Sequence, residues 1–214
     1  MGRSSRFASV FLLVLGGCAS APSPKESLSL NQAGAEAYRR GDLAAARDTF
    51  EKAIQVSSKD SESLALNALS LARVEQAAGN AAAAQRALEL VLGSAAAPGL
   101  RAEAAGRKAL LYFSAGELKQ AVDWQSRAQA LCAGTCRAQA AILNIGARIA
   151  LAGGQAAAAA QLAERVLRLP PSDDTRAEQA NAQRILVEAA AMAAASQAPR
   201  LAQPAVGAPR EEVR

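Results

Sequence analysis

Cys132 and Cys136 are the two residues of this sequence whose type and spacing most clearly permit chemistry. They stand in Leu-Cys-Ala-Gly-Thr-Cys, with three residues between them and a glycine that favours a turn. Such a turn can bring two Cα atoms within the roughly 4.4–6.8 Å that a disulfide requires. In an oxidising compartment we therefore expect a disulfide between them. A C-x-x-x-C redox centre and a pair of buried free thiols are the alternatives.

Sequence signatures of catalysis and nucleotide binding are absent. The 214 residues include no histidine, which excludes Ser-His and Cys-His nucleophile pairs and histidine-containing metal sites. Neither G-x-x-x-x-G-K-[ST] nor G-x-G-x-x-G after a strand occurs. The carboxylate pairs Asp60/Glu62 and Asp173/Asp174 lie at expected helix starts, where acidic side chains stabilise the helix dipole. We predict a protein that is not an enzyme and that needs no metal and no cofactor.

The first residues have the pattern of an export signal. Two arginines within the first six residues supply positive charge, residues 7–15 are apolar, and two glycines follow. The apolar run is shorter than the about 20 residues that a membrane-spanning helix needs. Leu15-Gly16-Gly17-Cys18 resembles the lipobox of bacterial lipoproteins. This resemblance implies cleavage before Cys18, diacylglycerol on its sulfur and an acyl chain on its freed amine.

The residue after Cys18 is Ala19 and not aspartate, which in a Gram-negative cell implies sorting to the outer membrane, facing the periplasm. Two alternatives are a cut after Ala21, which would leave Pro22 first, and a coincidental cysteine behind an ordinary signal. Removing residues 1–17 lowers the formal net charge from +5 to +3. A charge this small and dispersed does not indicate nucleic-acid binding.

The remainder of the chain has the pattern of paired helices. Alanine accounts for 57 residues and aromatic residues for 3%, a composition that favours an all-α protein. Glycines at positions 41, 79, 116 and 154 recur at intervals of 38, 37 and 38 residues. Each glycine lies between two stretches with apolar residues at helical spacing. Each can adopt a positive φ just after the first helix, and the residue that follows it can cap the second helix. The unit is therefore a helix, a short turn and an antiparallel helix.

This unit resembles the tetratricopeptide (TPR) repeat. Its period is three or four residues longer than the 34 residues of the family, the family's tryptophan is absent, and the second unit lacks the terminal proline. The resemblance covers residues 27–172 and implies a right-handed α-solenoid of about four hairpins. The small and bulky residues that carry it are Gly34, Gly41, Ala46, Phe50 and Ala53; Gly79, Ala84 and Leu88; Ala109, Tyr112, Gly116, Ala121 and Ala128; and Ala147, Gly154, Ala159 and Pro171.

Four segments follow: a signal peptide over 1–17, the lipidated cysteine and a flexible tether over 18–26, the solenoid over 27–197 and a disordered tail over 198–214. The solenoid ends in a capping helix that Ser172-Asp173-Asp174 can start and that runs to about Ser196, because a repeat stack needs a final element over its last apolar face. Residues 19–26 span at most about 28 Å, so the folded part is expected to lie close to the membrane.

In the TPR family the first helices of the hairpins line a concave groove. The family's register then places nine residues there, and their several arginines suit an extended peptide that carries carboxylates. Alternatively, they are ordinary solvated residues of exposed helix faces. Trp124 and Tyr112 fit interhelix packing better than binding. The nine residues are Asn31, Tyr38, Arg39, Arg73, Gln76, Arg107, Phe113, Asn144 and Arg148.

These features predict a lipid-anchored TPR scaffold that holds a protein partner for an envelope assembly, such as a pilus or secretion channel, a β-barrel insertion machine or peptidoglycan enzymes. Tethering raises the effective concentration of the binding face at the membrane. Two other classes are a self-associating structural lipoprotein, which dimerises through its convex side or last helix, and an envelope enzyme. A homodimer in solution would favour the self-associating protein. A deep pocket with converging polar residues would favour the enzyme.

Overall fold

The computed structural model describes residues 24–201, and within this range the chain forms nine α-helices and no strand. The prediction of an all-α protein is therefore confirmed. Cys18 and the predicted signal peptide lie outside the described residues. The helices are α1 (Pro24–Arg39), α2 (Leu43–Val56), α3 (Ser61–Ala77), α4 (Ala81–Gly93), α5 (Pro98–Ser114), α6 (Leu118–Cys132), α7 (Gln139–Ala152), α8 (Ala156–Leu167) and α9 (Asp173–Leu201).

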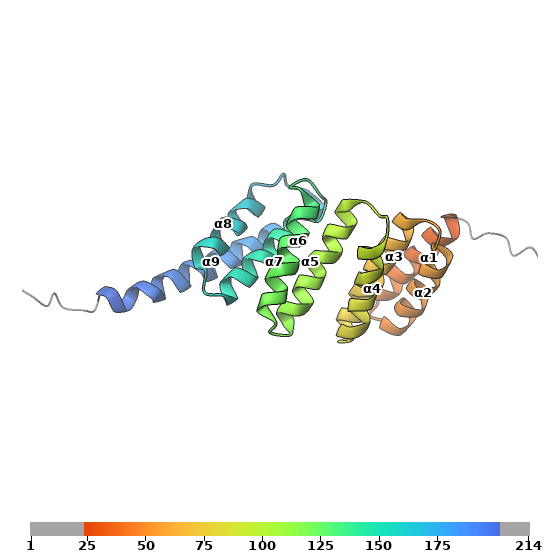
Figure 1. Ribbon diagram of the computed structural model, residues 1–214, viewed down its shortest axis with the longest axis horizontal. Helices are drawn as coiled ribbons and strands as arrows, with labels where there is room; N and C mark the ends of the chain where they lie inside the picture. Colours follow the sequence, from red (N-terminus) through yellow and green to blue (C-terminus); the bar gives the residue numbers. More distant parts are fainter. Residues whose placement is uncertain (1–23, 202–214) are drawn as a thin grey trace, which may run out of the picture.

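The helices stack in series as antiparallel pairs, from α1 at one end to α9 at the other (Figure 1). Each odd-numbered helix packs against the even-numbered helix that follows it and against the next odd-numbered helix. α9 packs against both α7 and α8, so it takes the place of the first helix of a fifth pair. The predicted solenoid of four hairpins with a C-terminal helix is confirmed.

Four glycines form the turns inside the hairpins. Their φ angles are +79° at 41, +76° at 79, +78° at 116 and +72° at 154, the left-handed region that favours glycine. After the first of these turns, the Asp42 side chain caps α2 by accepting a hydrogen bond from the Ala45 amide at 3.0 Å. The residues at 80, 117 and 155 make no such side-chain cap within the described chain, so the capping prediction holds for the first hairpin alone.

Buried polar side chains fix the first three helices relative to one another. Asn67 of α3 is 1% exposed, and its Nδ2 lies 3.1 Å from Ser27 Oγ of α1 and 3.1 Å from Ser57 Oγ at the end of α2. The same amide nitrogen lies 3.2 Å from the carbonyl oxygen of Ala53. Because an unpaired buried amide is costly, this network favours one arrangement of the three helices.

A second buried polar group, Glu75 of α3, joins α3 to α2. Both of its carboxylate oxygens accept hydrogen bonds from the Arg47 guanidinium, and Asn80 Nδ2 donates to Oε2 at 2.8 Å. The hydrogen bonds from Arg47 hold the pKa of Glu75 below its usual value. The carboxylate is therefore ionised and fully paired in the interior.

Two predicted boundaries are corrected by the structure. α1 begins at Pro24, inside the segment 18–26 expected to be a tether, because proline is well suited to the first helical position. α9 continues to Leu201, beyond the expected end near Ser196 and into the predicted tail over 198–214, since its alanines sustain a helix. Residues 202–214 lie outside the described residues. Within residues 24–201, no helix is both long and apolar enough to cross a membrane.

Candidate functional site

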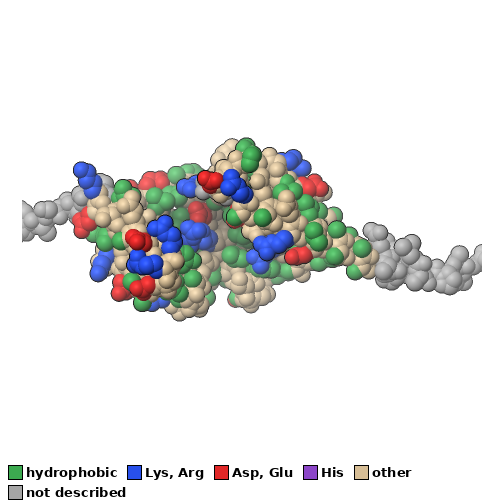
Figure 2. Space-filling view, turned by 180° about the vertical axis from the view of Figure 1, so that it is seen from behind, with side chains coloured by type: hydrophobic (Ala, Val, Ile, Leu, Met, Phe, Trp, Pro, Cys, Tyr) green, Lys and Arg blue, Asp and Glu red, His purple; other side chains and the backbone are tan. Residues whose placement is uncertain are grey.

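Two adjoining hollows lie on the face that the odd-numbered helices form, and together we call them the groove. The basic hollow, about 460 Å³, lies between the C-terminal halves of α3 and α5 and reaches Tyr38 of α1. The apolar hollow, about 680 Å³, is lined by α3, α5 and α7 and reaches Glu178 of α9. Arg73, Arg107 and Leu110 line both hollows. In Figure 2 a recess is visible near the middle of this face, with basic and acidic side chains at its edge.

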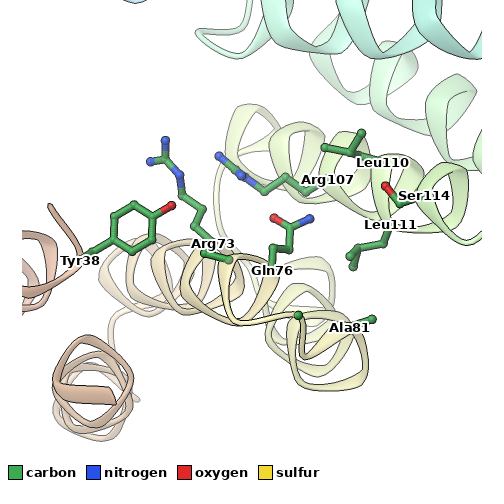
Figure 3. A pocket seen from close by; sticks show the side chains of 10 residues that line it. Tyr38, Arg73, Gln76, Ala81, Arg107, Leu110, Leu111 and Ser114 are labelled. Atoms are coloured by element: carbon green, nitrogen blue, oxygen red, sulfur yellow. The ribbon is translucent and has the colours of Figure 1, made fainter. Parts of the chain in front are cut away.

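Polar side chains from three helices converge on the basic hollow (Figure 3). Arg73 extends from α3 and Arg107 extends from α5 toward it, with the Gln76 amide and the Tyr38 hydroxyl beside them. Arg107 is paired with Glu103 one turn earlier, whose Oε1 accepts from Nη2 at 2.8 Å and from Nε at 3.1 Å. Arg73 is exposed and has no ion pair or hydrogen bond with any residue in the described range. The three charged groups leave a net single positive charge at this point.

Aliphatic side chains line the adjoining hollow. Leu66 of α3 is 50% exposed, and it faces the hollow together with Leu100 of α5 and Ile145 of α7. Gly106 forms part of the lining, and a Cβ there would come within 3.2 Å of Ile142. The hollow therefore offers an apolar surface directly beside an unpaired cation.

Four of the nine residues predicted for the groove line it: Tyr38, Arg73, Gln76 and Arg107. The other five lie elsewhere. Arg39 is exposed at the end of α1 and lines neither hollow. Phe113 and Arg148 face each other, with the guanidinium carbon 5.9 Å from the ring centre, and neither of them lines the groove.

The two asparagines are corrected by the structure, because both serve packing. Asn31 is half-buried and donates to Asn67 Oδ1 at 2.7 Å, as part of the buried network of the first three helices. Asn144 is 4% exposed and lies under α9. Its Nδ2 donates one hydrogen bond to the carbonyl oxygen of Glu178 at 2.8 Å and another to Oε2 of the same residue at 2.6 Å. The TPR register alone placed Asn144 in the open groove, whereas α9 packs over this part of α7 and buries it.

Two lining residues that sequence reasoning missed are Leu66 and Glu103. Glu103 is separated from Arg107 by one helical turn, a spacing that predicts an ion pair and was readable from the sequence. Leu66 had no such signal, because one of several leucines in α3 cannot be distinguished from its buried neighbours by pattern alone.

Trp124 of α6 lies away from the groove and packs between two cations. Lys108 Nζ lies 4.3 Å from its ring centre, and the Arg127 guanidinium carbon lies 4.7 Å from it. Lys108 itself is 7% exposed and is paired with Glu89 of α4 at 3.1 Å. The ring therefore joins α5 to α6 by cation–π contact, and the Lys108–Glu89 ion pair extends this connection to α4.

Cys132 and Cys136 are joined by a disulfide across the turn between α6 and α7, with their Cα atoms 5.0 Å apart. Ala133 and Gly134 inside this turn have φ angles of +48° and +78°. Cys136 also lies against the start of α5, since a Cβ at Gly99 would be 3.5 Å from the Cys136 Cβ. Gly99 and the residues after Cys136 line the apolar hollow, so the bridge lies behind one end of the groove.

No protein-family model and no curated protein matches this sequence. Solved structures of TPR proteins are similar to it in fold. TPR-like repeats of Podosopora anserina match with a TM-score of 0.53 and 22% identity, over 82% of this chain and 98% of that chain. A TPR protein of Parabacteroides merdae matches with a TM-score of 0.53 and 14% identity, over 84% of this chain and 68% of that chain. MamA protein matches with a TM-score of 0.50 and 15% identity, over 86% of this chain and 100% of that chain. At these identities the likeness establishes the TPR-like fold alone.

Proposed function

We propose that this chain is a non-enzymatic scaffold that binds a protein partner in its groove. The observation that carries the proposal is the groove itself: two adjoining hollows on the common face of the odd-numbered helices, with the unpaired cation Arg73 between them. A surface of this kind suits an extended segment that carries a carboxylate. Proteins with TPR repeats and the same helical stacking are its structural neighbours.

We propose further that the scaffold is a lipoprotein anchored through Cys18 to the outer membrane, facing the periplasm, where it serves an envelope assembly of the pilus, secretion, β-barrel insertion or peptidoglycan type. The support is the lipobox-like Leu15-Gly16-Gly17-Cys18 behind an apolar run. With α1 beginning at Pro24, five residues separate Cys18 from the first helix. Such a tether spans at most about 20 Å and would hold the α1 end of the stack at the membrane.

Site-directed photocrosslinking in native cells tests the scaffold proposal. A photoreactive phenylalanine analogue replaces Ala77, an exposed residue that lines the basic hollow, and in a matched strain replaces Ala157, an exposed alanine of α8. We expect position 77 to capture a defined partner and position 157 to capture none. Adding Arg73→Gln should reduce the capture at position 77, because the cation that would meet a carboxylate is lost.

Three outcomes contradict the proposal. Equal capture at positions 77 and 157 would move the interface away from the groove, and capture that is indifferent to Arg73→Gln would do the same. A crosslinked product with twice the mass of the chain would favour the self-associating structural protein. Circular dichroism of each variant serves as the control that the helices are intact.

A further inference from the structure

We infer that the groove recognises a two-part segment: one carboxylate at Arg73, and a bulky aliphatic side chain about three residues away in the apolar hollow. This inference rests on the proposed function and adds the chemistry of the partner. The partner is an extended peptide segment of another protein, chosen by one acidic and one aliphatic residue at a fixed spacing.

The charge balance where the two hollows meet selects one carboxylate. Arg73 and Arg107 are the two cations that line both hollows, and Glu103 neutralises one of them through its two hydrogen bonds with Arg107. Arg73 is left exposed, without a partner in the described chain. A guanidinium forms its strongest hydrogen bonds with a carboxylate, often through two parallel N–H groups. The Tyr38 hydroxyl and the Gln76 amide line the same hollow and can hydrogen-bond the backbone beside it.

The adjoining hollow selects an aliphatic side chain. Its lining includes Leu66, Leu100 and Ile145, and the half-exposed Leu66 is the one large apolar side chain of α3 that the other helices leave open to this degree. Leu90 of α4 is exposed to nearly the same extent, 48%, but lines neither hollow. Exposed leucine beside a cavity offers more apolar area to a ligand than the same leucine on a convex surface.

The spacing follows from the geometry of α3. Leu66 precedes Arg73 by seven residues, which is two turns or about 10 Å along the helix axis. An extended polyproline-II segment advances about 3.1 Å per residue and returns to the same face every third residue. An aliphatic and an acidic residue three positions apart therefore present both side chains to α3 at once.

A random dodecamer phage library, panned on the full chain purified in detergent, tests the inference. We expect the selected peptides to carry Asp or Glu together with Leu, Ile or Met, at a separation of about three residues. Arg73→Gln should weaken the synthesised peptides about tenfold, and Leu66→Ala about fivefold. The matched controls Arg165→Gln on α8 and Leu90→Ala on α4, both exposed and outside the groove, should leave affinity unchanged.

Replacing the acidic residue of the peptide by its amide completes a double-mutant cycle. The effect of Arg73→Gln should vanish with the amide peptide, because the pair is already broken. Additive losses would overturn the inference, and so would selected peptides without the acidic–aliphatic pairing, while leaving the scaffold proposal in place. A library that yields no peptide sensitive to either groove variant would instead overturn the proposed use of the groove.

Discussion

The ring of Phe50 in α2 lies directly against the backbone of Gly34 in α1. A Cβ built at Gly34 would be 2.9 Å from both Cε1 and Cζ of that ring. Phe50 is itself only 2% exposed, in a cluster with Ala37, Ala46 and Val74. The first hairpin thus closes on a contact that only glycine permits, because a buried aromatic ring has no space into which it can move.

Gly34→Ala should therefore destabilise the protein by about 1–3 kcal/mol, the usual cost of overpacking a core. Urea unfolding followed by circular dichroism measures the change. Gly93→Ala is the control: it lies at the end of α4 with no atom within 4 Å of its built Cβ, and it should be neutral or slightly stabilising. Phe50→Leu should lessen the effect of Gly34→Ala, and an equal effect in both backgrounds would contradict the contact.

Glu75→Gln should cost about 2 kcal/mol at pH 7, because it removes the charge that Arg47 hydrogen-bonds in the interior. The pKa of Glu75 is lowered by folding, so its contribution is present above the unfolded pKa and is lost as the pH falls through the lower, folded pKa. The difference in the free energy of unfolding between the wild type and Glu75→Gln should shrink as the pH falls from 7 toward 3. Unfolding curves at several pH values measure it.

The control for Glu75 is Glu36→Gln, since Glu36 forms an exposed ion pair with Arg40 at 3.1 Å on the surface of α1. Its effect should stay below about 0.5 kcal/mol. If both glutamine variants lost the same small free energy, the buried pair would be no stronger than a surface pair.

Replacing both Cys132 and Cys136 by alanine should lower the free energy of unfolding by about 2 kcal/mol, the chain-entropy value for a closed loop of about five residues. In the native protein both cysteines should resist alkylation until a reductant is added, because a disulfide joins their sulfur atoms. Mass spectrometry after alkylation measures this. Full alkylation without reduction would mean that the thiols are free in the cell.

Cys18→Ala should release the chain from the membrane fraction, because durable attachment requires two or more acyl chains on the first mature residue. Cell fractionation measures the release, and mass spectrometry of the wild type should find acyl groups on Cys18. A chain that retains its first seventeen residues, or a variant that stays with the membrane, would contradict the lipoprotein proposal. Ser20→Ala, in the same segment, is the matched control and should stay bound.

The hairpins were predictable because their signals are local. A glycine with positive φ two residues before a new helix acts within one turn of the chain, and the structure places all four where the spacing indicated. The Arg107–Glu103 pair is equally local. Asn31 and Asn144 were misplaced because their partners, Asn67 and Glu178, are 36 and 34 residues away. No pattern within a repeat reveals a contact between repeats.

The sequence alone therefore determined the helices, their pairing and their order, because periodicity, helix propensity and turn chemistry act over a few residues. Only the tertiary structure decided which polar side chains of the first helices remain open to a partner. That depends on how closely each odd-numbered helix packs against the next. α9 packs over α7 and buries Asn144, whereas α3 and α5 leave hollows between them in which Arg73 stays exposed.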